Sequence, residues 1–93
     1  MTRRRATIAT ASGLHARPAA LVTQLAASGG VPVLLGRVGQ PPVDATSILM
    51  LMGLRLEHGD EVELTAEGEG AERLLAELGA LLETDLDAVP ASR

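Results

Sequence analysis

The stretch EVELTA at residues 61–66 alternates polar and apolar side chains with a period of two, which is typical of a half-buried β-strand. Its inward-facing residues are Val62 and Leu64. After a glycine-containing link at residues 67–70, leucines recur at steps of three and four as far as Leu82, which predicts a helix with one apolar side. A strand followed by a one-sided helix favours a sheet with helices packed on one of its faces.

The residues before this strand predict the rest of the sheet and two more helices. From the amino terminus, these elements are a strand at residues 5–9, a helix at residues 16–27, strands at residues 31–35 and 40–43 joined by a hairpin turn at residues 36–39, and a short helix at residues 48–52. Because Pro41 and Pro42 cannot donate ladder hydrogen bonds, their strand belongs at a sheet edge. The order β-α-β-β-α-β-α favours an α+β fold in which the last strand pairs between the first two strands.

The length and composition of the chain predict one domain. The 93 residues are 46% hydrophobic and include no cysteine and no aromatic side chain, so aliphatic residues must form the core without disulfides. We expect a single domain at residues 1–88. The chain is expected to fray from Thr84 onward, and residues 89–93 are expected to form a flexible tail.

Charge and residue usage exclude several classes of function. The net charge is −4 and the pI is near 5.0, whereas a general nucleic-acid binder needs a basic face. All eight basic residues are arginines, which excludes lysine Schiff-base chemistry. The scattered glutamates between residues 67 and 83 indicate a solvated face rather than a metal site, so no metal and no cofactor are expected. No apolar run resembles a secretory signal or a membrane span, which predicts a cytoplasmic protein without membrane insertion.

The segment SGLHARP at residues 12–18 is the one motif that carries chemistry. It places His15 and Arg17 where the first predicted helix begins. The N–H groups of a first helical turn lack intrahelical acceptors and, together with the helix dipole, favour an anion. Arg17 adds donors that match phosphate oxygens, and a neutral ring nitrogen of His15 is a nucleophile near pH 7. These features predict reversible phosphoryl transfer through His15.

Each candidate residue also has a simpler interpretation. From position alone, His15 fits a solvated loop histidine and Arg17 a surface arginine. Ser47 fits the N-cap of the short helix, and Met50 and Met52 fit core positions. Hydrolysis is disfavoured because the chain has no nucleotide-binding P-loop motif and only one other histidine.

Together with two later motifs, the histidine segment resembles HPr, the histidine-containing phosphocarrier family of the bacterial phosphoenolpyruvate-dependent sugar phosphotransferase system. GLHARPA at residues 13–19 resembles the family's active-site signature, SIL at residues 47–49 its second motif, and HGDEV at residues 58–62 the turn into its last strand. The resemblance spans nearly the whole chain. It implies an open-faced β-sandwich, in which three helices cover one face of a four-stranded antiparallel sheet.

The resemblance also implies how the site works. His15 would accept a phosphoryl group on Nδ1 from phosphorylated enzyme I and pass it to the enzyme IIA domain of a sugar permease. Phosphate binding is assigned to Ser12, Ala16 and Arg17, with Arg17 clamping the phosphoryl oxygens. The protein would thus be a phosphoryl carrier rather than an enzyme, and we expect it to be a monomer.

A regulatory site and a docking patch follow from the same resemblance. Ser47 matches the serine that an ATP-dependent kinase phosphorylates in many Gram-positive relatives, and Thr46 is an alternative acceptor. A serine kinase and regulators are therefore further expected partners. The predicted docking patch consists of Ala20, Ile48, Leu49 and Met52.

Two other functions compete with the carrier. The first is a regulatory HPr-like protein that binds transcription factors or enzymes; such relatives have been recognised by loss of the histidine, which this chain keeps. The second is a small-molecule-binding module in which residues 13–18 merely begin a helix. Incubation with enzyme I and phosphoenolpyruvate distinguishes the three.

Overall fold

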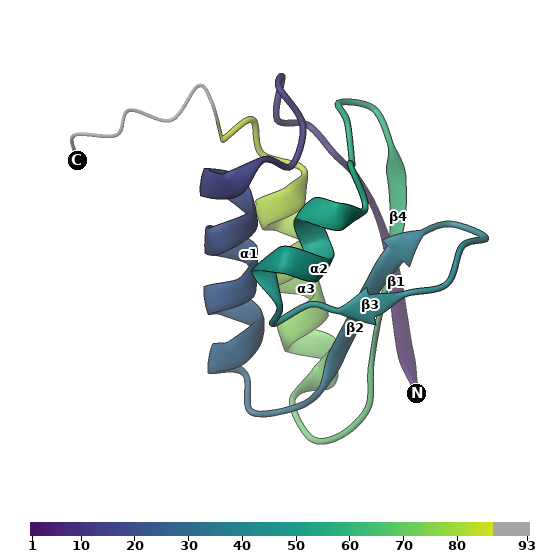
Figure 1. The fold of residues 1–93 in the computed structure, drawn as a ribbon. Helices are drawn as coiled ribbons and strands as arrows, with labels where there is room; N and C mark the ends of the chain where they lie inside the picture. The colour runs from purple at the N-terminus through teal and green to yellow at the C-terminus, as the bar shows by residue number, and fades with distance from the viewer. Residues whose placement is uncertain (87–93) are drawn as a thin grey trace.

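The chain folds into one antiparallel sheet that carries helices on one face (Figure 1). The computed structural model describes residues 1–86. Its elements are β1 (Thr2–Thr7), α1 (Ala16–Ser28), β2 (Val33–Arg37), β3 (Val43–Asp44), α2 (Ile48–Gly53), β4 (Glu61–Ala66) and α3 (Ala71–Leu82). The strand order is β1-β4-β2-β3, and all neighbouring strands are antiparallel. The predicted open-faced sandwich is therefore confirmed, with β4 in the interior of the sheet and β3 at its edge.

The core lies between the covered face of the sheet and the apolar sides of α1 and α3. Val62 of β4 lies opposite Ala6, and Leu64 lies opposite Leu35; all four side chains are buried. The leucines of α3 pack over these strands, and Figure 1 shows α3 running in the opposite direction to α1. Burial of each large aliphatic side chain contributes roughly 1.5–3 kcal/mol, so a core without aromatic residues is sufficient here.

The first three strands have boundaries that differ from the predicted ones, because cross-strand pairing sets them. β1 covers Thr2–Thr7 rather than residues 5–9, since its ladder runs along the full length of β4. β2 covers Val33–Arg37 rather than residues 31–35, and β3 has only the two residues Val43–Asp44. By contrast, β4 and α3 begin and end where the sequence pattern predicts.

Arg37 is the last residue of β2, so the prediction that it lies in the hairpin turn is wrong. Its backbone pairs opposite Val62 in β4. Its guanidinium donates hydrogen bonds to the carbonyl oxygens of Leu54 (2.6 Å) and Arg55 (2.8 Å) and to the carboxylate of Asp60 (2.8 Å). Arg37 thereby ties the end of β2 to the segment between α2 and β4.

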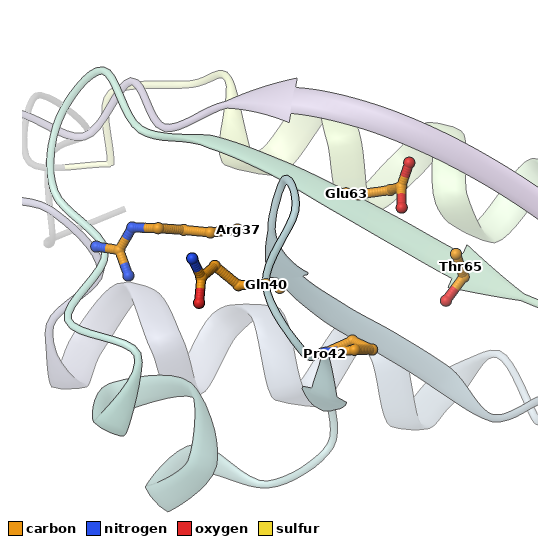
Figure 2. A pocket seen from close by; sticks show the side chains of 6 residues that line it. Arg37, Gln40, Pro42, Glu63 and Thr65 are labelled. Carbon is orange, nitrogen blue, oxygen red and sulfur yellow. The ribbon is translucent and has the colours of Figure 1, made fainter.

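Figure 2 shows a pocket beside the turn that joins β2 to β3. Arg37 extends from this pocket toward the loop before β4, whereas Glu63 and Thr65 line it from β4. Gly36 lets the returning chain pass closely, since a Cβ there would lie 2.8 Å from the Cα of Pro42. The lining of this pocket contains none of the residues predicted for phosphoryl transfer or docking.

Residues 84–86 pack against the loop that follows β1, so the prediction that the chain frays from Thr84 is wrong for these residues. The hydroxyl of Thr10, which is 1% exposed, donates to the carbonyl oxygen of Thr84 (3.3 Å) and accepts from the N–H of Leu86 (3.2 Å). The N–H of Ala11 donates to the carboxylate of Asp85 (3.2 Å). The predicted domain boundary at residue 88 and the tail at residues 89–93 lie outside the described residues.

Candidate functional site

The loop between β1 and α1 holds His15 at the surface. Gly13 adopts a φ of +81°, and its N–H donates to the carbonyl oxygen of Thr10 (2.9 Å). The next residue, Leu14, is buried, and its N–H donates to the carbonyl oxygen of Leu56 (2.9 Å). Because the preceding residues are fixed in this way, the exposed His15 lies at a defined position at the start of α1.

His15 is the N-cap residue of α1. The first hydrogen bond of the helix runs from the N–H of Ala19 to the carbonyl oxygen of His15 (2.9 Å). Since α1 begins at Ala16 and Pro18 has no N–H, the amides of Ala16 and Arg17 have no acceptor within the helix. The exposed side chain of Arg17 belongs to the same turn. Two amide donors and the positive end of the helix dipole therefore lie next to His15, an arrangement that favours an anion, and Arg17 adds a positive charge to the same helical turn.

A shallow hollow lies beside His15, where the loop before α1 approaches the chain that follows α2. The hollow is lined by Ser12, Leu14, His15, Met52, Arg55, Leu56 and Glu57. It joins the predicted phosphate-binding residue Ser12 to Met52 of the predicted docking patch. Arg55 was not predicted as a site residue, because an arginine after a short helix has no distinguishing pattern in the sequence.

Asp60 supports the chain that borders this hollow. Its carboxylate accepts hydrogen bonds from the N–H of Glu57 (2.8 Å) and from Arg37. The Glu57 N–H lowers the pKa of Asp60; partial burial opposes this shift, and Arg37 adds to it. Because the folded-state pKa lies below the unfolded value of about 3.9, this stabilisation is present above that pH. It is lost as the pH falls through the lowered pKa.

Ser47 caps α2, which confirms the N-cap interpretation. Its Oγ accepts a hydrogen bond from the N–H of Met50 (3.3 Å). The chain before it is organised by Asp44, whose carboxylate accepts from the N–H (2.9 Å) and the hydroxyl (2.7 Å) of Thr46. These two hydrogen bonds, the backbone one first, lower the pKa of Asp44. The hydroxyl of Thr46 is thus already engaged, whereas the hydroxyl of Ser47 only accepts a weak helix-capping bond.

Most apolar side chains of α2 are exposed. Leu49 is 81% exposed, Ile48, Met50 and Met52 are between 37% and 49% exposed, and Leu51 is buried. A six-residue helix has room for little more than one inward-facing side chain, so Met50 and Met52 are not core residues. Ala20 lies half-buried on α1, which packs against α2. The residues of the predicted docking patch are therefore carried by two adjoining helices.

Metal binding requires several ligating side chains close together, and a membrane span requires a long apolar helix. Within residues 1–86, no group of three or more His, Asp or Glu side chains is placed to hold a metal ion. None of the helices formed by the same residues has both the length and the apolar character needed to cross a membrane.

Several known proteins are similar to this chain in sequence and in fold. The family model described as "PTS HPr component phosphorylation site" matches residues 2–84. Phosphocarrier protein HPr of Streptomyces coelicolor is 39% identical over 90 residues, with 97% of each chain covered. HPr-like protein Crh of Bacillus subtilis is 40% identical over 75 residues, which are 81% of this chain and 87% of that protein.

A solved structure of an HPr protein is also similar to this chain in fold. The crystal structure of HPr-C-His from Thermoanaerobacter tengcongensis superposes with a TM-score of 0.86 at 32% identity, covering 97% of this chain and 100% of that chain. The family model, the similar sequences and the similar fold agree, and the chain therefore belongs to the HPr phosphocarrier family of the phosphotransferase system.

Proposed function

We propose that this protein accepts a phosphoryl group on Nδ1 of His15 from phosphorylated enzyme I and passes it to the enzyme IIA domain of a sugar permease. The observation that carries the proposal is the position of His15, exposed at the N-cap of α1 beside the free first-turn amides. We propose that it does so as a monomer in the cytoplasm.

The transfer requires a nucleophile and a stabilised product. The lone pair of a neutral His15 ring nitrogen forms the N–P bond as the bond between phosphorus and the donor nitrogen breaks, and the donor keeps that electron pair. The transferred group brings about −1.5 to −2 charges. We expect the amides of Ala16 and Arg17 and the Arg17 guanidinium to meet this charge, because both residues belong to the first turn of α1 directly after His15, and Ser12 lines the same hollow as His15.

Phosphorylation from phosphoenolpyruvate through enzyme I tests the proposal directly. Intact-mass spectrometry should detect one added phosphoryl group per chain, and the label should be acid-labile and alkali-stable, as expected for a phosphoramidate. A chain that acquires no label would contradict the carrier function. That result would favour the regulatory HPr-like alternative, which needs binding but no phosphohistidine.

Arg17→Ala should keep the fold and slow phosphoryl transfer, with kcat/KM reduced on the order of 10- to 100-fold. The guanidinium meets charge that develops in the transition state, so its loss affects the rate more than the structure. Arg17→Lys should recover only part of the rate, because an ammonium group lacks the bidentate fork. Steady-state transfer kinetics with enzyme I measure both variants. Unchanged kinetics in both would make Arg17 a surface residue without a role in transfer.

Ser47→Asp should raise the KM for enzyme I about tenfold or more, equivalent to about 1.4 kcal/mol of binding, while thermal stability stays nearly constant. Aspartate replaces serine well as an N-cap, so α2 should remain formed. Its charge, however, lies beside the exposed Ile48 and Leu49, where apolar contact with a partner must exclude water.

Ser47→Ala is the matched control for this prediction. It removes the cap without adding charge, so it should lower the free energy of unfolding by about 1 kcal/mol and leave the KM unchanged. If Ser47→Asp leaves the KM at the wild-type value, Ser47 lies outside the docking surface, and the expectation that a serine kinase regulates docking through Ser47 is contradicted.

A further inference from the structure

Arg55 has an unusual backbone conformation directly beside the proposed phosphoryl site. Its φ is +54°, and it is the only residue other than glycine with a positive φ within residues 1–86. The left-handed region disfavours an L side chain relative to glycine. Arg55 directly follows the C-cap of α2, a position at which many helices end in the left-handed region but usually with a glycine. The conformation therefore raises the question of what the Arg55 side chain does.

The backbone of Arg55 is fixed by contacts that leave its side chain available. Its N–H donates to the carbonyl oxygen of Met52 (3.2 Å), and its carbonyl oxygen accepts from the Arg37 guanidinium (2.8 Å). Arg37 is itself held by the carboxylate of Asp60. Within the described residues, the exposed guanidinium of Arg55 forms no ion pair with a carboxylate, in contrast to the guanidinium of Arg37.

Arg55 lines the same hollow as His15. Of the other residues in that lining, Glu57 is the only one with a formal negative charge, and its exposed side chain faces solvent as well. Arg17 belongs to the first turn of α1, whereas Arg55 lies in the hollow that His15 itself lines, so a dianionic phosphoryl group on His15 would have a second guanidinium nearby. One guanidinium balances only one of the two negative charges of the phosphoryl group, and a second guanidinium here would balance the other.

We infer that Arg55 is a second phosphoryl-binding arginine, which stabilises the phosphorylated form of His15. The inference rests on the proposed carrier function and extends it to a residue outside the recognised motifs. Arg55 donates N–H hydrogen bonds to the phosphoryl oxygens after the N–P bond has formed. It gives up no proton and takes no part in bond making, because its guanidinium stays protonated.

An exchange equilibrium between two carriers tests this inference separately from binding to partners. Unlabelled wild type and ¹⁵N-labelled Arg55→Gly are mixed in equal amounts. Enough phosphoenolpyruvate is added to phosphorylate half of all the chains, together with a trace of enzyme I. Intact-mass spectrometry then gives the phosphorylated fraction of each. The final ratio depends only on the stability of the two phosphohistidines, since enzyme I changes the rate of exchange and not its end point. Backbone strain at residue 55 is present in both forms of the wild type and cancels.

The phosphoryl group should favour wild type over Arg55→Gly by about two- to fivefold at low salt, the size of one exposed charge pair, and less at high salt. Arg55→Lys should lie between the two. Arg73→Gln is the matched control, because Arg73 is an exposed arginine beside Ser28 and Gly29 at the other end of α1; it should share the phosphoryl group equally with wild type. A ratio of one for Arg55→Gly overturns the inference. If that variant is also phosphorylated more slowly, Arg55 contacts the partner instead.

Inorganic phosphate provides a test that needs no enzyme I. At constant ionic strength, phosphate should shift the amide NMR signals of Ala16 and Arg17, with a Kd about two- to fivefold higher in Arg55→Gly. Equal Kd values, or the absence of any phosphate-dependent shift, would count against Arg55. Failure of the carrier function itself has a different signature: no chain, wild type included, would be labelled by phosphoenolpyruvate and enzyme I.

Discussion

His15→Ala is expected to abolish phosphorylation by phosphoenolpyruvate and enzyme I, and to leave the melting temperature nearly unchanged. The histidine is exposed, so its removal should change the free energy of unfolding by less than about 0.5 kcal/mol. The chain has no cysteine and no lysine that could replace it as a nucleophile. Intact-mass spectrometry of the variant after incubation should therefore show no added phosphoryl group.

His58→Ala is the control for this experiment. His58 is the second histidine of the chain and lies exposed in the turn before β4, next to Gly59. This variant should be labelled as completely as wild type. Equal labelling of His15→Ala and wild type would remove His15 from the mechanism, whereas loss of labelling in both variants would indicate that the two histidines act together.

Gly13→Ala is expected to have the second-largest effect, because it disturbs the loop that positions His15. At a φ of +81°, an alanine is disfavoured by about 1–2 kcal/mol. Its Cβ would also lie 2.5 Å from the carbonyl oxygen of Leu56, which is the acceptor of the Leu14 N–H. The backbone has to shift, and this hydrogen bond must weaken. We expect the free energy of unfolding to fall by about 2–3 kcal/mol and the melting temperature by roughly 10–20 °C.

Gly30→Ala separates the cost of the positive φ from the cost of the contact with Leu56. Gly30 has a similar φ of +75°, but a Cβ there would meet no atom within 4 Å. Its replacement should therefore show the conformational cost alone, about 1–2 kcal/mol, with normal phosphorylation. The stability of both variants can be measured by far-UV circular dichroism, since the chain has no aromatic residue for fluorescence. If both variants lose the same stability and both are phosphorylated normally, the contact with Leu56 does not position His15.

The parts of the fold that could be predicted are those in which one element determines its own pattern. The alternation in residues 61–66 and the leucine spacing of residues 71–82 arise from burial of one face, and β4 and α3 match them. β2 and β3 could not be placed in the same way. Arg37 belongs to β2 because it pairs with Val62, which is distant in sequence, and because its side chain has acceptors in another loop.

In the candidate site, too, features set by local sequence could be predicted, whereas features set by distant contacts could not. The positions of His15, Arg17 and Ser47 at helix starts could be predicted, because each lies in a local motif there, and the structure confirms these positions. The place of Arg55 beside His15 could not be predicted, since its φ is imposed by the end of α2 and by Arg37 rather than by its own residue type. The exposure of Met50 was missed for a related reason: a run of apolar residues suggests burial, and only the length of α2 and its packing determine which side chains are covered.

The hydrogen bonds between the loop after β1 and the last described residues have a consequence for the order of folding during synthesis. Ala9 pairs with Leu82, and Thr10 bonds to Thr84 and Leu86, partners that are more than seventy positions later in the chain. The strand before this loop, β1, also cannot pair until β4 has been synthesised. A nascent chain leaving the ribosome therefore exposes His15 early but cannot hold its loop in place until residue 86 has emerged. Incomplete chains therefore carry His15 without the loop geometry that the complete fold gives it.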